Sequence, residues 1–162
     1  MAEGKFPHFS NMEFIPDDAY PIETSGAYIN LSDKGIRSVE FVRIINDRLL
    51  FVEAKASTAH PDSSPEPYSK QINEINEKFI HSLNLLSSIK VGITEESLPD
   101  SFHAERKLSL EFVLVIRNHE PEWCRRVKAT LQQLLPEYLV KIWRPEVIVI
   151  NYEKAKEYDL VS

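Results

Sequence analysis

The sequence predicts an α/β fold with a single mixed central sheet flanked by helices. Stretches rich in β-branched and aromatic residues occur at 37–56, 108–117 and 146–151. Apolar residues at helical spacing lie between them, at 68–90 and from Pro121 onward. Strands that alternate with helices are typical of a layered α/β domain. Since 162 residues supply one sizeable core, we expect residues 1–162 to form a single domain.

The N-terminal residues before 37 are weakly patterned. Residues 12–15 and 27–31 are candidate short strands, and turns are expected at 16–18 and 32–35. No amphipathic helix is evident before residue 37.

Residues 37–56 predict a β-hairpin, because two β-rich runs flank Asn46 and Asp47. With these two residues as the turn, Glu40 lies directly opposite Glu53. Alternation of side chains then places six residues on one face: Ser38, Glu40, Val42, Phe51, Glu53 and Lys55. The other face is almost wholly apolar, with Val39, Phe41, Leu50, Val52 and Ala54. This predicts a central strand pair that is covered on both sides.

The facing glutamates predict a cation site. Like charges opposite one another on a sheet are destabilising, by about 4 kcal/mol at about 4 Å and an effective dielectric near 20. A divalent cation bound by Glu40 and Glu53, with Lys55 beside it, would relieve this repulsion. Without metal, Glu53→Gln is therefore expected to be neutral or stabilising. The alternative interpretation is a solvated surface hairpin, on which Glu and Lys are common.

The rest of the chain supplies the other layers. A Pro- and Ser-rich loop at 57–67 follows Lys55 and is a plausible substrate-facing element. The helix at 68–90 carries Glu74 and Lys78 as an outward i,i+4 pair. Residues 92–107 connect it to the strand at 108–117. Pro121 begins a helix that ends or kinks at Pro136, and 146–151 and 152–158 are a last strand and a helical turn.

Composition limits the function classes. The net charge of −6 argues against a broad basic surface for nucleic acid. One cysteine, Cys124, excludes an intramolecular disulfide, and the five histidines lack zinc-site spacing. We expect no membrane partner and a cytoplasmic location, since no stretch approaches about 20 apolar residues and the start does not resemble a signal peptide. His60, in the loop after Lys55, could contact a substrate.

The chain has a carboxylate on one strand, a hairpin to Glu53-Ala54-Lys55, and then a helix and a strand. This order resembles the PD-(D/E)xK, or restriction-endonuclease-like, superfamily. The resemblance covers about 37–118. It implies that Glu40, Glu53 and the Ala54 carbonyl bind Mg²⁺ or Mn²⁺, and that Lys55 acts on the attacking water. An N-terminal acidic ligand would be Glu13 or Glu23. Glu40 replaces the family's Asp, and Val39 replaces the preceding Pro.

The resemblance implies a restriction-endonuclease-like core and a metal-dependent nuclease that hydrolyses DNA or RNA. Two carboxylates and several waters suit magnesium, and such an ion activates water for attack on phosphorus. The alternative is a non-catalytic interaction protein on the same fold, acting within a larger complex. A protein partner or a homo-oligomer is compatible with either hypothesis.

Overall fold

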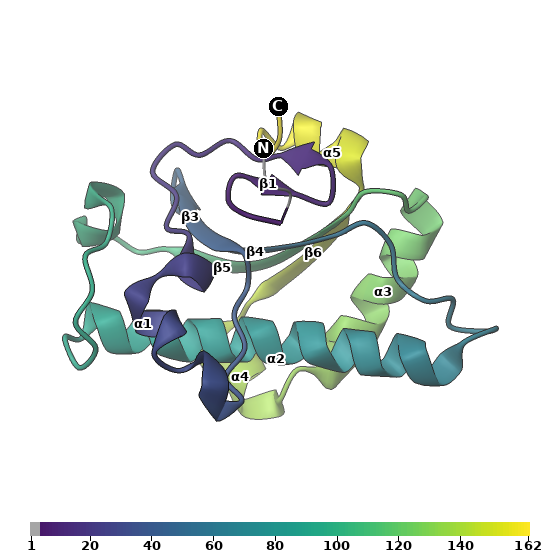
Figure 1. Ribbon diagram of the computed structural model, residues 1–162, viewed down its shortest axis with the longest axis horizontal. Helices are drawn as coiled ribbons and strands as arrows, with labels where there is room; N and C mark the ends of the chain where they lie inside the picture. The colour runs from purple at the N-terminus through teal and green to yellow at the C-terminus, as the bar shows by residue number, and fades with distance from the viewer. Residues whose placement is uncertain (1–3) are drawn as a thin grey trace.

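A four-stranded mixed sheet organises the computed structural model, which describes residues 4–162 (Figure 1). The strands are β3 (Phe41–Ile45), β4 (Arg48–Lys55), β5 (Ser109–Ile116) and β6 (Glu146–Ile150), and they lie in that order. β3 pairs antiparallel with β4, and β4, β5 and β6 are parallel. The predicted mixed α/β fold is confirmed. Its closer likeness to a restriction endonuclease and the single-domain assignment stay predictions.

The two faces of the sheet are covered differently (Figure 1). On one face lie α2 (Pro65–Lys90), α3 (Pro121–Leu134) and the short α4 (Glu137–Trp143), whose apolar side chains pack on Val42, Phe51 and Phe112. On the other face, the N-terminal segment and α5 (Tyr152–Glu157) cover Phe41 and Val52. The sheet is thus the middle layer of three. Within residues 4–162, no helix has the length and apolarity to cross a membrane.

The N-terminal segment forms short elements. β1 (His8–Phe9) and β2 (Met12–Glu13) pair antiparallel, so the strand predicted at 12–15 is shorter than expected. The 3-10 helices η1 (Ile22–Thr24) and η2 (Ser32–Lys34) flank α1 (Gly26–Ile29). The predicted strand at 27–31 is wrong. The Ser25 side chain accepts a hydrogen bond from Tyr28 N and caps a helical turn there, a local signal that outweighs β propensity.

Helix boundaries follow the prolines. α2 begins at Pro65 rather than at the predicted 68, because Pro is well tolerated in the first turn of a helix. α3 begins at Pro121 as predicted and ends at Leu134. Pro136 separates it from α4, which the sequence did not predict as a separate helix. The connection between α2 and β5 contains the 3-10 helix η3 (Asp100–His103).

The predicted hairpin register is confirmed where β3 and β4 pair, with Ile45 opposite Arg48. Asn46 has a φ of 54°, the left-handed conformation that the turn requires. The predicted face of Val39 is wrong. β3 begins only at Phe41, after a bend at Glu40, and Val39 therefore packs with α2 rather than beside Phe41.

Candidate functional site

The candidate site lies where β4 extends past the start of β3. Pairing of the two strands ends at Phe41 and Val52, whereas β4 pairs with β5 as far as Lys55. At Glu40 the chain bends and its N–H donates to the Val52 carbonyl, so the regular pairing does not continue to Glu53. The last residues of β4 thus have a strand neighbour on one side only, and the segment before β3 lies at the other side.

Two side chains of α2 hold that segment in place. The backbone N–H of Arg37 donates to His81 Nδ1 (2.9 Å), and that of Val39 donates to Ser82 Oγ (2.9 Å). The N–H of Glu40 donates to the Val52 carbonyl (3.0 Å). Three backbone hydrogen bonds within four residues therefore fix the segment that carries Glu40 between α2 and β4.

Glu53 is the centre of the site, and its two oxygens have different surroundings. The residue is 0% exposed. Its Oε2 accepts from Lys78 Nζ at 2.5 Å and lies 3.7 Å from Lys55 Nζ. Its Oε1 is buried and has no hydrogen-bond partner among the described residues. An unpaired buried carboxylate oxygen is costly, so Oε1 is the atom of this site best placed to gain from a ligand.

Glu40 is protonated at neutral pH. Burial, a hydrogen bond with the Glu23 side chain and the negative charge of Glu53 raise the pKa of Glu40 to about 10. The protonated Glu40 carboxyl donates in this hydrogen bond to Glu23. Three carboxyl groups therefore lie near one another, Glu23 from η1, Glu40 from the segment before β3, and Glu53 from β4.

Lys78 and Glu53 form the charged pair of the site. Burial alone would lower the pKa of Lys78, but the nearby Glu53, Glu40 and Glu23 outweigh it and raise that pKa. Burial raises the pKa of Glu53, and Lys78 and Lys55 oppose the rise. With an ammonium 2.5 Å away, we assign Glu53 as the ionised carboxylate and Glu40 as the protonated one.

The Ala54 carbonyl points to the same edge. The Val52 carbonyl accepts from Glu40 N on the β3 side of β4, and the Lys55 carbonyl accepts from Arg117 N on the β5 side. Successive carbonyls of a strand point to opposite edges. The carbonyl of Ala54 therefore points to the β3 side, beyond the residue at which β3 pairing ends.

The structure brings Glu40, Glu53 and Lys55 near one another, although the pairing of β3 with β4 ends at Phe41 and does not include Glu40. Of the two N-terminal acidic candidates, only Glu23 lies beside Glu40. Glu13 lies in β2, whose neighbours pack on the opposite face of the sheet, whereas Glu23 is hydrogen-bonded to Glu40.

Lys78 was missed by the sequence analysis, which placed it outside with Glu74. In the structure Glu74 lies 3.7 Å from Arg37 instead, and Lys78 reaches Glu53. The sequence did contain a signal that Lys78 faces the sheet. Lys78 is three residues after Ile75 and four before Ser82, both buried, so it lies within the sheet-facing stripe of the helix.

Other residues weighed from the sequence have structural roles. His60 Nδ1 accepts from Asp62 N (3.1 Å), and its ring packs edge-on against Trp123 at 4.4 Å. Cys124 is buried, and burial raises the pKa of its thiol to about 11 despite the nearby Arg125. A thiol in this state is a poor nucleophile.

The donor set fits a hard cation in its chemistry. As the side chains stand, no three His, Cys, Asp or Glu residues within 4–162 are grouped to hold a metal ion. A proton on Glu40 and two lysines balance the charge instead. The unpartnered Glu53 Oε1, with the carboxyl groups of Glu40 and Glu23 nearby, nevertheless offers the oxygen ligands that Mg²⁺ and Mn²⁺ prefer.

Comparisons of the chain with protein-family models, with curated proteins and with solved structures found no match.

Proposed function

We propose that this protein is a divalent-metal-dependent phosphodiester hydrolase that acts on nucleic acid. The observation that carries the proposal is that the two oxygens of the Glu53 carboxylate have different surroundings. One oxygen is held by Lys78 and lies near Lys55, and the other is buried without a partner. A carboxylate held in this way is oriented by one oxygen and available through the other.

Glu53 Oε1, Glu40, Glu23 and the Ala54 carbonyl are the residues that would hold the ion. When bound, magnesium or manganese would lower the pKa of a coordinated water and stabilise charge on the phosphoryl oxygens. Glu40 must give up its proton to act as a ligand. Since its hydrogen-bond partner Glu23 would also be a ligand, that proton would have to leave to solvent when the ion binds.

The two lysines have different roles because they differ in exposure. The Lys55 side chain is 38% exposed and the Lys78 side chain 18%. Lys55 can therefore reach a substrate phosphate or the attacking water and remain close to Glu53. Lys78 is committed to Glu53 Oε2 at 2.5 Å, and its role is to fix the orientation of that carboxylate.

A second candidate function, non-catalytic interaction within a larger complex, has its own support. α4 exposes four large apolar side chains: Tyr138, Val140, Ile142 and Trp143. Exposed apolar groups that lie close together often mark a protein interface. The ion pair of Lys78 with Glu53 would then serve stability alone, and no metal would bind.

A cleavage assay on the full chain tests the first proposal. Single- and double-stranded DNA and RNA are incubated at low salt with Mg²⁺ or Mn²⁺, because an acidic protein binds nucleic acid weakly at high salt. We expect metal-dependent cleavage by the wild type. Lys55→Ala should abolish cleavage and leave calorimetric metal binding intact, because the lysine acts on water or phosphate rather than on the ion.

Lys34→Ala is the matched control, since Lys34 is an exposed lysine on η2 that pairs with its exposed neighbour Asp33 and lies outside the carboxylate site. It should cleave like the wild type. Full activity of Lys55→Ala would assign the cleavage to another site or to a contaminant. A wild type that binds neither metal and cuts none of the four substrates would leave the interaction protein as the better account.

A further inference from the structure

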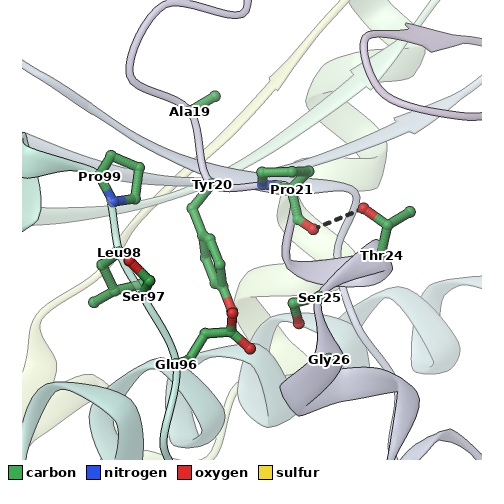
Figure 2. Close-up of a pocket in the computed structure, with 10 residues that line it drawn as sticks. All are labelled: Ala19, Tyr20, Pro21, Thr24, Ser25, Gly26, Glu96, Ser97, Leu98 and Pro99. Atoms are coloured by element: carbon green, nitrogen blue, oxygen red, sulfur yellow. Dashed lines mark hydrogen bonds between the residues drawn. The ribbon is translucent and has the colours of Figure 1, made fainter.

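A pocket is formed partly by residues that flank Glu23 in the chain. This pocket, of about 510 Å³, is lined by residues 19–21, 24–26 and 96–99. Figure 2 shows two walls, one with Pro99, Leu98 and Ser97 and the other with Pro21 and Thr24. The Tyr20 side chain runs between them toward Glu96. Thr24, on the pocket wall, is the chain neighbour of Glu23, whose carboxyl is hydrogen-bonded to Glu40.

The polar atoms of this pocket are mainly hydrogen-bond acceptors that can still accept a further hydrogen bond. Glu96 Oε2 accepts from Ala27 N (3.0 Å), and no bond to its Oε1 is formed within the described residues. The Tyr20 hydroxyl is buried in a residue that is 4% exposed, and its only close side-chain hydroxyl within residues 4–162 is that of Ser25, with which it forms no well-aligned hydrogen bond. Ser25 is already engaged, since it donates to the Ile22 carbonyl at 2.6 Å and accepts from Tyr28 N at 3.1 Å.

A carboxylate in such a pocket selects a ligand that presents two neighbouring N–H donors. Among the nucleobases, guanine presents N1–H and the N2 amino group side by side on its Watson–Crick edge. Adenine and cytosine alternate one amino donor with a ring acceptor, which would face the carboxylate unfavourably. Uracil and thymine flank a single N–H with two carbonyl groups. Unpaired bases are commonly recognised through this edge and by packing on flat side chains.

We propose that this pocket binds an unpaired guanine base of the nucleic-acid substrate, with Glu96 accepting from N1–H and the N2 amino group and the two prolines packing on the ring. The inference rests on the proposed function, because it is the adjacent carboxylate site that makes a nucleotide the expected occupant. A guanidinium group of a peptide would satisfy the same carboxylate. Guanine is favoured by the pocket volume of about 510 Å³ and by Thr24 of its lining, which follows Glu23 in the chain.

The test uses calorimetry on the full chain in EDTA, so that no metal contributes to binding. GMP is compared with IMP, which lacks the N2 amino group, with AMP, and with inorganic phosphate. We expect GMP to bind roughly five- to 150-fold more tightly than IMP or AMP, the range for one good paired contact. Glu96→Gln, which keeps an oxygen for Ala27 N, should remove this preference.

Glu95→Gln is the matched control, because Glu95 is the exposed chain neighbour of Glu96 and does not line the pocket. It should bind GMP like the wild type. Tyr20→Phe is a second variant that removes only the unpartnered hydroxyl, and it should weaken GMP binding. Thermal melts confirm that each variant is folded before its affinity is measured.

Equal affinity for the three nucleotides, no binding, or a GMP preference that survives Glu96→Gln would overturn the proposal. So would binding of methylguanidinium in place of GMP, which would indicate a peptide arginine. The outcome is separate from that of the cleavage assay. Cleavage without guanine preference would remove this pocket and keep the hydrolase, whereas selective GMP binding without cleavage would keep the pocket and remove the hydrolase.

Discussion

The ammonium of Lys78, on helix α2, lies 2.5 Å from Oε2 of Glu53, on strand β4, and this carboxylate has no exposed surface. The ion pair joins the helix to the sheet at the candidate site. It also changes the balance of charges there. Glu53 faces a cation supplied by the protein itself in addition to the neighbouring carboxyl groups.

Glu53→Gln should destabilise the metal-free protein, by about 3 kcal/mol, because it leaves the half-buried Lys78 ammonium without its main partner. This reverses the expectation from the hairpin alone, in which removing one of two facing glutamates relieves repulsion. Urea unfolding measures the free energy directly.

The double variant Glu53→Gln with Lys78→Met is the control. It should lose less stability than the sum of the two single variants, since the second change removes the unpaired charge left by the first. Additive losses would show that the two groups do not interact in solution.

Glu40→Gln should stabilise the protein at high pH and leave its free energy of unfolding almost unchanged at low pH. The pKa of Glu40 in the folded protein, about 10, lies above that of the unfolded chain. Between these two values the folded state holds one proton more, so wild-type stability falls as pH rises, by at most about 1.4 kcal/mol per pH unit. Glutamine does not titrate and removes this slope.

Unfolding curves of both proteins at several pH values from about 5 to 9, in EDTA, measure the difference. A wild type and variant with parallel stability profiles over this range would show that Glu40 is ionised in the folded protein, contrary to the assignment.

His119 should produce a slope of the opposite sign at lower pH. Burial lowers its pKa, and its Nε2 lies 2.8 Å from Thr58 Oγ1. A group whose pKa is depressed in the folded state favours the neutral form there. Its stabilising contribution is thus present above the pKa of the unfolded chain and is lost as pH falls. His119→Gln should lose less stability than the wild type between about pH 7 and pH 5, as followed by thermal melts. An equal loss in the two proteins would contradict this.

Local patterns were enough to predict the hairpin and its register as far as Phe41 and Val52, because strand alternation and a two-residue turn fix the register without other contacts. They were not enough for Lys78. Its partner is 25 residues away in the chain, and only the packing of α2 on the sheet decides whether a lysine at the side of the apolar stripe faces water or Glu53.

Val39 and α1 show the same limit. A bend at Glu40 turns Val39 toward α2, where Ser82 receives its N–H. In α1, the carboxylate of Glu96 accepts from Ala27 N across 69 residues. A β-branched or aromatic pattern of five residues carries no information on such distant partners, so the prediction at 27–31 followed propensity and was wrong.

Glu23 and Glu13 give a test of which carboxylates hold the ion. If Mg²⁺ binds the folded protein alone, it raises the melting temperature by mass action. Glu53→Gln should abolish this rise, and Glu23→Gln should reduce it, because Glu23 is hydrogen-bonded to Glu40. Glu13→Gln is the matched control, since this exposed residue lies in β2 over the opposite face of the sheet, and it should respond like the wild type. Melts with and without millimolar Mg²⁺ compare the four proteins. An undiminished response in Glu53→Gln would place the bound ion elsewhere, and a loss confined to Glu13→Gln would assign the N-terminal ligand to β2 in place of η1.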